Sequence, residues 1–293
     1  MHLLIDGDGP LYRAAAAAQH YEYYIDGLVF RLKKDAVAHA KDTDYDVSEI
    51  VKSELIIEEE YAAIHNINSI MGTLLSDIAP RTYTCYIGGN GNYRYLVNPE
   101  YKAGRPPRPH HYDAVKEYLI KRYDTEVVNG IEADDACSMA QYAAVDTSRV
   151  MSMYATVDDC LKARYNNTCI ASNDKDLLMV PGNHYNWQKK IHQFITEDEG
   201  DYNFYTQLLT GDSTDNIFGL ADIGPARAKD ILKGTTNSLE RYNACREAYE
   251  SMGREDLEDV ARQIWMSKYN PDDWMPPKSA NGYNYAANNT NYG

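Results

Sequence analysis

The stretch Gly130-Ile-Glu-Ala-Asp-Asp-Ala-Cys137 places three acidic side chains, Glu132, Asp134 and Asp135, just ahead of an alanine-rich run. Alanine favours helix, and acidic side chains in the first turn are stabilised by the positive end of the helix dipole. The stretch therefore predicts the start of a helix. Three carboxylates this close also repel one another, so at neutral pH they need protons or a cation. An acidic first turn on a solvated helix is the alternative, and the octapeptide alone leaves both interpretations open.

Other acidic residues follow predicted strands. Residues 3–5 are an apolar run that ends at Asp6, and residues 169–172 form another short strand that leads into Asp174 and Asp176. The alternation of strands and helices predicts an α/β fold, in which a mostly parallel central sheet is flanked by helices. Ligands of such sheets bind at the carboxyl ends of the strands, so one crevice could collect these acids.

Further elements follow from local patterns. A hairpin is expected where residues 21–25 and 28–32 flank an Asp-Gly turn, before a weakly patterned region to about 53. A strand is expected at 82–87 and a helix at about 111–123. Residues 54–78 have apolar side chains at helical spacing. The predicted core stripe of this helix consists of Ile57, Tyr61, Ile64, Met71 and Leu75.

The expected domain organisation has three parts. Residues 1–210 form the α/β core, which includes a Pro-rich, basic segment near 98–123. Residues 211–275 form a helical region, with two helices at about 239–251 and 256–269, and nothing but helices is expected after Asp176. Residues 276–293 are rich in Asn, Tyr and Gly, a composition typical of a disordered tail.

The overall composition narrows the class of protein. The chain is 44% hydrophobic and 25% charged, which is typical of a soluble globular protein. It has no apolar run long enough to cross a membrane, and its first residues do not resemble a signal peptide, so a cytoplasmic protein is expected. Five Cys residues without a paired spacing favour reduced thiols over a disulfide framework or a zinc site.

The net charge of −15 argues against a generic nucleic-acid binder, but the charge is uneven along the chain. Residues 22–60 contain 11 acidic and 5 basic residues, whereas residues 94–122 contain 7 basic and 3 acidic residues. This pattern allows a phosphate-facing strip beside an acidic pocket. A chance cluster on a solvated helix is the alternative.

The acidic residues suggest a metal site. Oxygen ligands without His or Cys select Mg²⁺ or Mn²⁺ over Zn²⁺. More carboxylates than one ion can use suggest two ions, which lie about 4 Å apart in two-metal sites and stabilise the attacking and leaving oxygens of a phosphodiester. Lys102 and Arg105 are candidates to hold the scissile phosphate. Taken singly, each acid is more simply a helix cap or a surface charge. The candidate ligands are Asp6, Glu132, Asp134, Asp135, Asp174, Asp176, Asp212 and Asp215.

Five motifs together resemble the 5′ nucleases, which comprise flap endonucleases, the 5′–3′ exonuclease domains of bacterial DNA polymerases and phage 5′–3′ exonucleases. The resemblance spans residues 3–232, and the compact phage branch is the most similar. In chain order the motifs are Ile5-Asp-Gly, Tyr101-Lys-Ala-Gly-Arg-Pro-Pro, Gly130-Ile-Glu-Ala-Asp-Asp, Ser172-Asn-Asp-Lys-Asp and Gly211-Asp-Ser-Thr-Asp-Asn.

The resemblance implies a PIN-like 5′ nuclease core and a set of metal ligands. Asp6, Glu132 and Asp134 would hold a first Mg²⁺ ion, and Mn²⁺ could substitute. Asp174, Asp176 and Asp215 would hold a second, with Asp134 near both ions. Asp135 and Asp212 would act through water.

The resemblance also implies a DNA-binding surface. Lys102 and Arg105 would lie at the base of an arch, built by the stretch to about 123, that gathers the 5′ single strand, with Tyr101 and Arg108 also contacting nucleic acid. Residues 217–232 resemble a helix–three-turn–helix element. There Gly219, Ile223, Gly224 and Lys229 would contact duplex DNA, and a K⁺ ion could bind the backbone.

One departure from the family pattern weakens the first metal site. The family has an Asp at the end of the second strand, where this chain has Gly88 and Gly89. Losing one ligand need not abolish a Mg²⁺ site, because Mg²⁺ keeps several waters. Asp8 is a possible substitute ligand.

The resemblance implies a Mg²⁺-dependent, two-metal 5′ nuclease on DNA, acting on 5′ ends, flaps or RNA–DNA hybrids. It would be a monomer without membrane contact that serves phage DNA replication in the bacterial host cytoplasm. Two alternatives remain: a protein of this fold that binds branched DNA but cuts poorly, and a PIN-like ribonuclease. Residues 211–232 speak against the ribonuclease.

Overall fold

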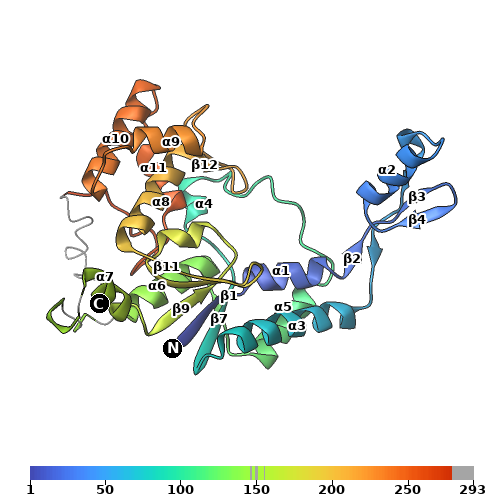
Figure 1. Cartoon of the computed structure of the whole chain (residues 1–293), viewed down its shortest axis with the longest axis horizontal. Helices are drawn as coiled ribbons and strands as arrows, with labels where there is room; N and C mark the ends of the chain where they lie inside the picture. Colours follow the sequence, from blue (N-terminus) through green and yellow to red (C-terminus); the bar gives the residue numbers. More distant parts are fainter. Residues whose placement is uncertain (146, 149–150, 155, 279–293) are drawn as a thin grey trace. The chain divides into compact units, whose positions relative to one another are not determined.

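The computed structural model describes residues 1–145, 147–148, 151–154 and 156–278 (Figure 1). These residues form two compact units. The sheet unit contains Met1–Gly7, Pro80–Pro106 and the described residues from Thr125 onward. The helix unit contains Asp8–Ala79 and Pro107–Asp124. Among the described residues, no helix has both the length and the apolar character needed to cross a bilayer.

A six-stranded sheet in the order β11-β10-β9-β1-β7-β8 forms the centre of the sheet unit (Figure 1). Neighbouring strands run parallel except for β11, which is antiparallel to β10. This arrangement confirms the α/β fold with a mostly parallel sheet. The strands are β1 (His2–Asp6), β7 (Thr82–Gly88), β8 (Thr125–Val128), β9 (Thr168–Ala171), β10 (Gly182–Asn186) and β11 (Ile191–Ile195).

Helices cover this sheet and continue the chain beyond it. Helix α6 (Ala133–Ala143) packs against β1, β7 and β9. Helix α8 (Glu197–Thr210) contacts α9, α10 and α11, and their apolar side chains share one core with the sheet. The other elements of the unit are α4 (Arg94–Val97), η2 (Met151–Met153), α7 (Val157–Arg164), η3 (Asp176–Met179), β12 (Gly211–Asp212), β13 (Ile217–Phe218), α9 (Pro225–Ile231), α10 (Ser238–Ser251) and α11 (Leu257–Ile264).

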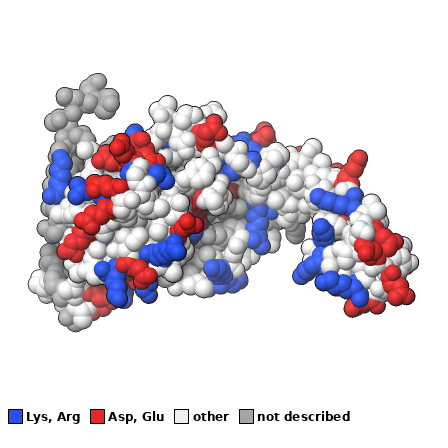
Figure 2. Space-filling model, turned by 90° about the horizontal axis from the view of Figure 1, so that it is seen from above, with Lys and Arg blue, Asp and Glu red and all other residues white. Residues whose placement is uncertain are grey.

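The helix unit is built on three helices that pack against one another: α1 (Asp8–Ala16), α3 (Glu60–Ile78) and α5 (Tyr112–Arg122). Strands β2 (Gln19–His20) and β6 (Ile56–Ile57) pair beside them. A smaller subdomain contains β3 (Tyr23–Ile25), β4 (Leu28–Phe30), α2 (Lys33–Asp42), η1 (Val47–Glu49) and β5 (Val51–Lys52). The predicted hairpin across Asp26-Gly27 is confirmed as β3 and β4. Figure 2 shows both acidic and basic side chains on the visible face of this subdomain, on the right of the view.

Four local predictions differ from the structure. The region predicted to be weakly patterned contains α2, and the region after Asp176, predicted to hold only helices, contains β10 and β11. The predicted core stripe of α3 is wrong in most positions, because Tyr61 is 75% exposed while the buried side chains are Ala63, Ile67, Met71 and Leu74. The helix predicted at 256–269 ends at Ile264. From residue 279 on, the predicted disordered tail lies outside the described residues.

Candidate metal centre and active site

All eight predicted metal ligands lie in the sheet unit, near the carboxyl ends of its strands. Asp6 is the last residue of β1, and the pair Asp174 and Asp176 follows β9, which is the neighbour of β1. Glu132 caps the N-terminus of α6, whose first turn contains Asp134 and Asp135. Parallel pairing aligns these strand ends at one edge of the sheet. The remaining two acids, Asp212 and Asp215, lie in the turn at β12.

Ser172 links the first and second groups of acids. Its hydroxyl donates to Asp6 Oδ2 at 2.7 Å and accepts the backbone N–H of Asp174 at 2.9 Å. Asp174 Oδ1 in turn accepts the backbone N–H of Asp176 at 2.9 Å. Asp6 and Asp174 are thus connected through Ser172, which agrees with the prediction that one crevice collects these acids. Sequence reasoning assigned Ser172 no role, although its position directly after a strand was a usable signal.

Two basic side chains and a tyrosine lie between Glu132 and Asp215. Lys102 Nζ pairs with Glu132 Oε1 and is 3.6 Å from Asp215 Oδ2. Arg105 pairs with Asp215 Oδ1. The buried Tyr101 hydroxyl is 2.8 Å from Glu132 Oε2 and 3.0 Å from Asp215 Oδ2. Lys102 therefore contacts one acid of each predicted metal set, and Arg105 contacts Asp215 of the second set.

The backbone holds this basic segment on the acidic turn. Lys102 has a left-handed conformation with φ of 59°, and its N–H donates to the Asp215 carbonyl at 2.9 Å. The Asn216 side chain donates to the Glu100 carbonyl at 2.9 Å. A left-handed non-glycine residue is uncommon, so its presence here indicates that the surrounding contacts fix the turn.

The proton affinities of the acids differ according to their surroundings. Loss of solvent, with the charges of Glu132 and Asp135, raises the pKa of Asp134 well above its ordinary value. Loss of solvent and the nearby Asp174 charge raise the pKa of Asp176 to about 7. Burial would also raise the pKa of Asp215, but Lys102 and Arg105 hold it below its ordinary value. Crowded carboxyls with raised pKa values are typical of sites that take up a cation.

The donor set fits hard divalent cations. Every candidate ligand is a carboxylate, and Asp176 Oδ1 is buried without a hydrogen-bond partner. Among the described residues, no three His, Cys, Asp or Glu side chains already have the arrangement of a metal site. Glu132 pairs with Lys102, and Asp215 pairs with Arg105. An ion held by Glu132 and Asp215 would have to displace Lys102 and Arg105 from them.

Asp135 has a different environment from the other acids. Its carboxylate is fully buried and accepts Arg94 Nη1 at 2.6 Å and Nη2 at 3.0 Å, and the Ser267 N–H at 3.1 Å. Arg94 also donates to the carbonyls of Gln263 and Trp265 at 2.7 and 2.8 Å. The predicted outer-shell role for Asp135 is not what these contacts favour, because guanidinium and backbone donors saturate its oxygens. No local sequence signal pairs Arg94 with a residue 41 positions away.

The end of β7 distinguishes the two glycines that stand where the resemblance implies an aspartate. Asp6 pairs with Tyr86, and side chains two residues apart share a face of the sheet, so a side chain at Gly88 would point to the face of Asp6. Gly89 lies beyond the strand, where a Cβ would be 2.3 Å from Asn129 Oδ1 and 2.6 Å from the Val128 carbonyl. Of the two glycines, Gly88 is therefore the position from which a carboxylate would share the face of Asp6.

The predicted helix–three-turn–helix segment contains a tight backbone crossing followed by a helix. A Cβ at Gly219 would lie 2.3 Å from the backbone nitrogen of Gly211, so a glycine is required there. Gly224 precedes α9, with Pro225 in its first turn. The Gly219 carbonyl accepts Arg254 Nη1 at 2.9 Å, and Asp256 holds the same guanidinium. A K⁺ ion does not fit at this carbonyl, because a positive charge already occupies it.

The other predicted nucleic-acid contacts are spread over the molecule. Ile223 is partly buried against the core, whereas Gly224 and Lys229 are exposed on the turn and on α9. Tyr101 is only 3% exposed, so it faces the acids and not the solvent. Arg108 lies in the helix unit, where its guanidinium stacks over Tyr112 at 4.6 Å. The exposed members of the predicted contacts are thus Gly224, Lys229 and Arg108.

Comparisons with known proteins agree with this picture. No protein-family model matches the chain. A 5′-3′ exonuclease of Buchnera aphidicola is 25% identical over 218 residues, which cover 66% of this chain and 72% of that protein. A mutant of the T5 5′-exonuclease has a TM-score of 0.50 at 15% identity, covering 90% of this chain and 86% of its own. A T5 protein co-crystallised with metal ions has the same TM-score at 16% identity, covering 90% and 88%.

The solved structures show that the chain has the fold of the T5 5′-exonuclease. The sequence match is independent of the fold comparison and names the same kind of enzyme. Together these likenesses agree with the resemblance to the 5′ nucleases that the five motifs indicated.

Proposed function

We propose that this chain is a divalent-metal-dependent 5′ nuclease that hydrolyses phosphodiesters of DNA. The observation that carries the proposal is the contact of Lys102 and Arg105 with Glu132 and Asp215 at the carboxyl edge of the sheet. Two positive side chains suited to a phosphate lie beside oxygen ligands suited to Mg²⁺ or Mn²⁺. A pure binding surface has no need for carboxylates with raised pKa values next to the phosphate contacts.

The assignment of ligands follows the positions of the acids. Asp6, Glu132 and Asp134 would hold one ion, and Asp174, Asp176 and Asp215 a second, with Asp212 near the second. Two bound ions would supply stabilisation of the attacking and leaving oxygens in an in-line displacement. We give Asp135 a structural role, because Arg94 saturates its oxygens.

The chain's own residues then position the substrate. Lys102 and Arg105 hold the scissile phosphate through charge-assisted hydrogen bonds. Tyr101 orients Glu132 and Asp215 through its hydroxyl, so we infer that it acts on the ligands and not on the DNA. Residues 219–229 offer exposed backbone and Lys229 to the duplex, a contact that reads no base. A K⁺ ion in this turn would need carbonyls other than that of Gly219.

The test is cleavage of a 5′-labelled flap duplex with Mg²⁺, Mn²⁺ or EDTA. Wild-type protein should cut with either metal and stop in EDTA. Asp134→Ala should abolish cutting and spare DNA binding, because it removes a ligand and not a phosphate contact. Asp158→Ala, at an exposed acid on α7, is the matched control. Wild-type turnover by Asp134→Ala would refute the two-metal assignment. Flap, nicked and RNA–DNA hybrid substrates compared in parallel define the preferred 5′ end.

A second function is favoured by one observation. Gly88 removes a carboxylate from the face of Asp6, which weakens the first metal site. A protein of this fold that binds branched DNA without cutting it would bind equally well in EDTA and Mg²⁺ and release its DNA intact. A role in phage DNA replication, as a monomer in the host cytoplasm, belongs to the first proposal and is tested by sedimentation and by deleting the gene.

A further inference from the structure

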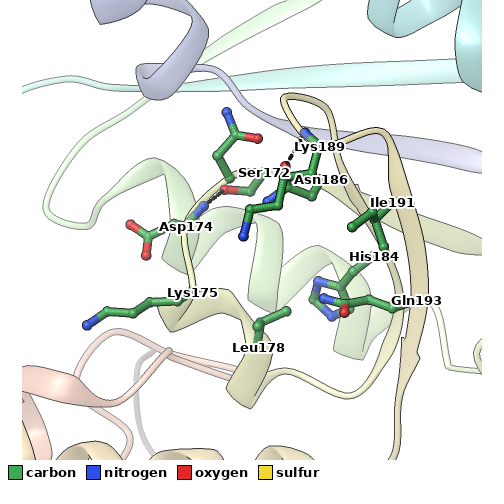
Figure 3. A pocket seen from close by; sticks show the side chains of 10 residues that line it. Ser172, Asp174, Lys175, Leu178, His184, Asn186, Lys189, Ile191 and Gln193 are labelled. Atoms are coloured by element: carbon green, nitrogen blue, oxygen red, sulfur yellow. Dashed lines mark hydrogen bonds between the residues drawn. The ribbon is translucent and has the colours of Figure 1, made fainter.

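A cavity of about 170 Å³ opens beside the acid Asp174 and is not explained by the metal ligands (Figure 3). Its walls come from the loop after β9 and from the hairpin of β10 and β11. Figure 3 shows Asp174 and Lys175 on one side of this space and Ile191 and Gln193 on the other. The cavity lies wholly in the sheet unit.

The hairpin turn is fixed to the loop that carries the acids. The Gln188 N–H donates to Asn173 Oδ1 at 3.1 Å, and the Lys189 N–H donates to Asn186 Oδ1 at 2.9 Å. Ser172, at the start of the loop, donates its N–H to the Tyr185 carbonyl of β10 at 3.1 Å. These bonds hold Lys189 at the wall of the cavity through backbone positions on both segments.

The lining suits an anion joined to a less polar group. Lys175 pairs with Asp212 at 3.3 Å. Among the described residues no carboxylate forms an ion pair with Lys189, so the positive charge of Lys189 is available to an incoming anion. Asn186 and Gln193 supply side-chain amides, and Ile191, which is 48% exposed, supplies an apolar edge. A phosphate on Lys189 with a sugar against Ile191 uses all of these groups.

The volume limits the size of the ligand. Sites for whole small molecules occupy about 300 Å³ or more. A cavity of about 170 Å³ is smaller, so it encloses part of a nucleotide and leaves the base outside. Because Asp174 lines the cavity and is also a proposed metal ligand, the bound unit would adjoin the bond that is cut.

We propose that this cavity is a subsite for the phosphate and sugar of one nucleotide next to the scissile bond, with Lys189 as its phosphate contact. The subsite rests on the proposed nuclease function, but its binding chemistry can be measured without cleavage. A nucleotide within the DNA strand and a released nucleoside 5′-monophosphate offer the same phosphate and sugar, so the experiment separates these two sources.

The first measurement is calorimetric binding of a deoxynucleoside 5′-monophosphate in Mg²⁺, to wild type, Lys189→Ala, Lys189→Arg and Lys190→Ala. Lys190 is the adjacent exposed lysine and does not line the cavity, so it controls for net charge. Loss of a charged hydrogen bond should weaken binding roughly tenfold in Lys189→Ala. Lys189→Arg should keep most of the affinity, and Lys190→Ala should match wild type. Equal affinity of wild type and Lys189→Ala for both ligands, mononucleotide and DNA, would overturn the subsite.

The second measurement is the salt dependence of duplex DNA binding in Ca²⁺. If the subsite holds a nucleotide of the strand, Lys189→Ala should lower the slope of log affinity against log salt by roughly one, while Lys190→Ala leaves it unchanged. If Lys189→Ala weakens mononucleotide binding but leaves the salt dependence of DNA binding unchanged, the subsite binds the released product. A protein that cuts no DNA but still binds the mononucleotide through Lys189 would refute the nuclease and retain the subsite.

Discussion

Arg94 and Asp135 form a bidentate ion pair with no solvent exposure, at 2.6 and 3.0 Å, and Arg94 Nη1 is also 3.6 Å from Glu132 Oε2. The pair ties α4 to the first turn of α6 and, through the carbonyls of Gln263 and Trp265, to the end of α11. The position of Glu132 and Asp134 thus depends on a salt bridge that the substrate never reaches.

Breaking this pair should strongly destabilise the fold. Arg94→Met leaves Asp135 as a buried charge without its partner, which costs about 3–5 kcal/mol of unfolding free energy. Arg246→Met removes an exposed pair with Glu250 and should cost about 1 kcal/mol or less. Urea denaturation of both variants measures the difference. Similar losses in the two would mean that the buried pair contributes no more than a surface one.

Lys102→Ala should slow the chemical step. Its charge lies between Glu132 and Asp215, where the reacting phosphate would bind, so its removal should lower kcat by about 100-fold or more. Lys162→Ala, an exposed lysine on α7, is the control. Steady-state cleavage kinetics separate two roles. A rise in KM at unchanged kcat would show that Lys102 only holds the substrate.

Gly88→Asp should strengthen the first metal site, because the new carboxylate would lie on the face of Asp6. The Mg²⁺ concentration for half-maximal cleavage should fall, or cleavage should appear if the wild type lacks it. Gly89→Asp is the comparison. Its Cβ would lie 2.3 Å from Asn129 Oδ1, so this variant should lose stability without gaining metal affinity. A gain in metal affinity for Gly89→Asp alone would reverse the assignment.

Mg²⁺ binding should weaken as the pH falls through neutrality. The pKa of Asp176 is raised to about 7, so below that pH the metal must displace a proton, and affinity falls up to tenfold per pH unit for each proton released. Thermal unfolding with and without Mg²⁺ at pH 6 and pH 8 measures this. Asp176→Asn should bind Mg²⁺ more weakly at pH 8 and show a flatter pH dependence. An unchanged dependence would remove Asp176 from the ligand set.

In the metal-free protein, the raised pKa of Asp176 makes the fold less stable as the pH rises. Between the ordinary value of 3.8 and about 7, the folded Asp176 binds more protons than the unfolded chain does. Its contribution therefore destabilises the metal-free fold as the pH rises through this window. Comparing wild type with Asp176→Asn without metal isolates the effect.

The ends of the strands and the acidic residues that follow them could be predicted, because both are visible in short stretches of the sequence. Apolar runs followed by Asp at residues 6 and 174 could be found by inspection, and the parallel order then brought them together. Strand β10 and the edge strand β11 were missed because polar residues such as His184, Gln193 and Asn186 interrupt their alternation. The α3 stripe failed because Tyr61 fits helical spacing yet faces solvent.

Contacts between distant residues left no such signal. Nothing near Arg94 predicts that it is buried on Asp135, and nothing near Lys102 predicts its hydrogen bond to the Asp215 carbonyl. These contacts depend on how strands and helices pack, so only the folded structure reveals them.

The pairing of Lys102 and Arg105 with Glu132 and Asp215 has a consequence for how the site is loaded. Basic side chains of the protein already balance the charges of these two carboxylates, so we expect the chain to fold without metal. If a divalent cation binds these carboxylates, it would displace Lys102 and Arg105, and both side chains would then be available to a phosphate. The affinity for metal would then be the difference between the free energy of the carboxylates with the metal and their free energy with Lys102 and Arg105. A variant that removes Lys102 should therefore bind Mg²⁺ more tightly, although it cleaves DNA more slowly.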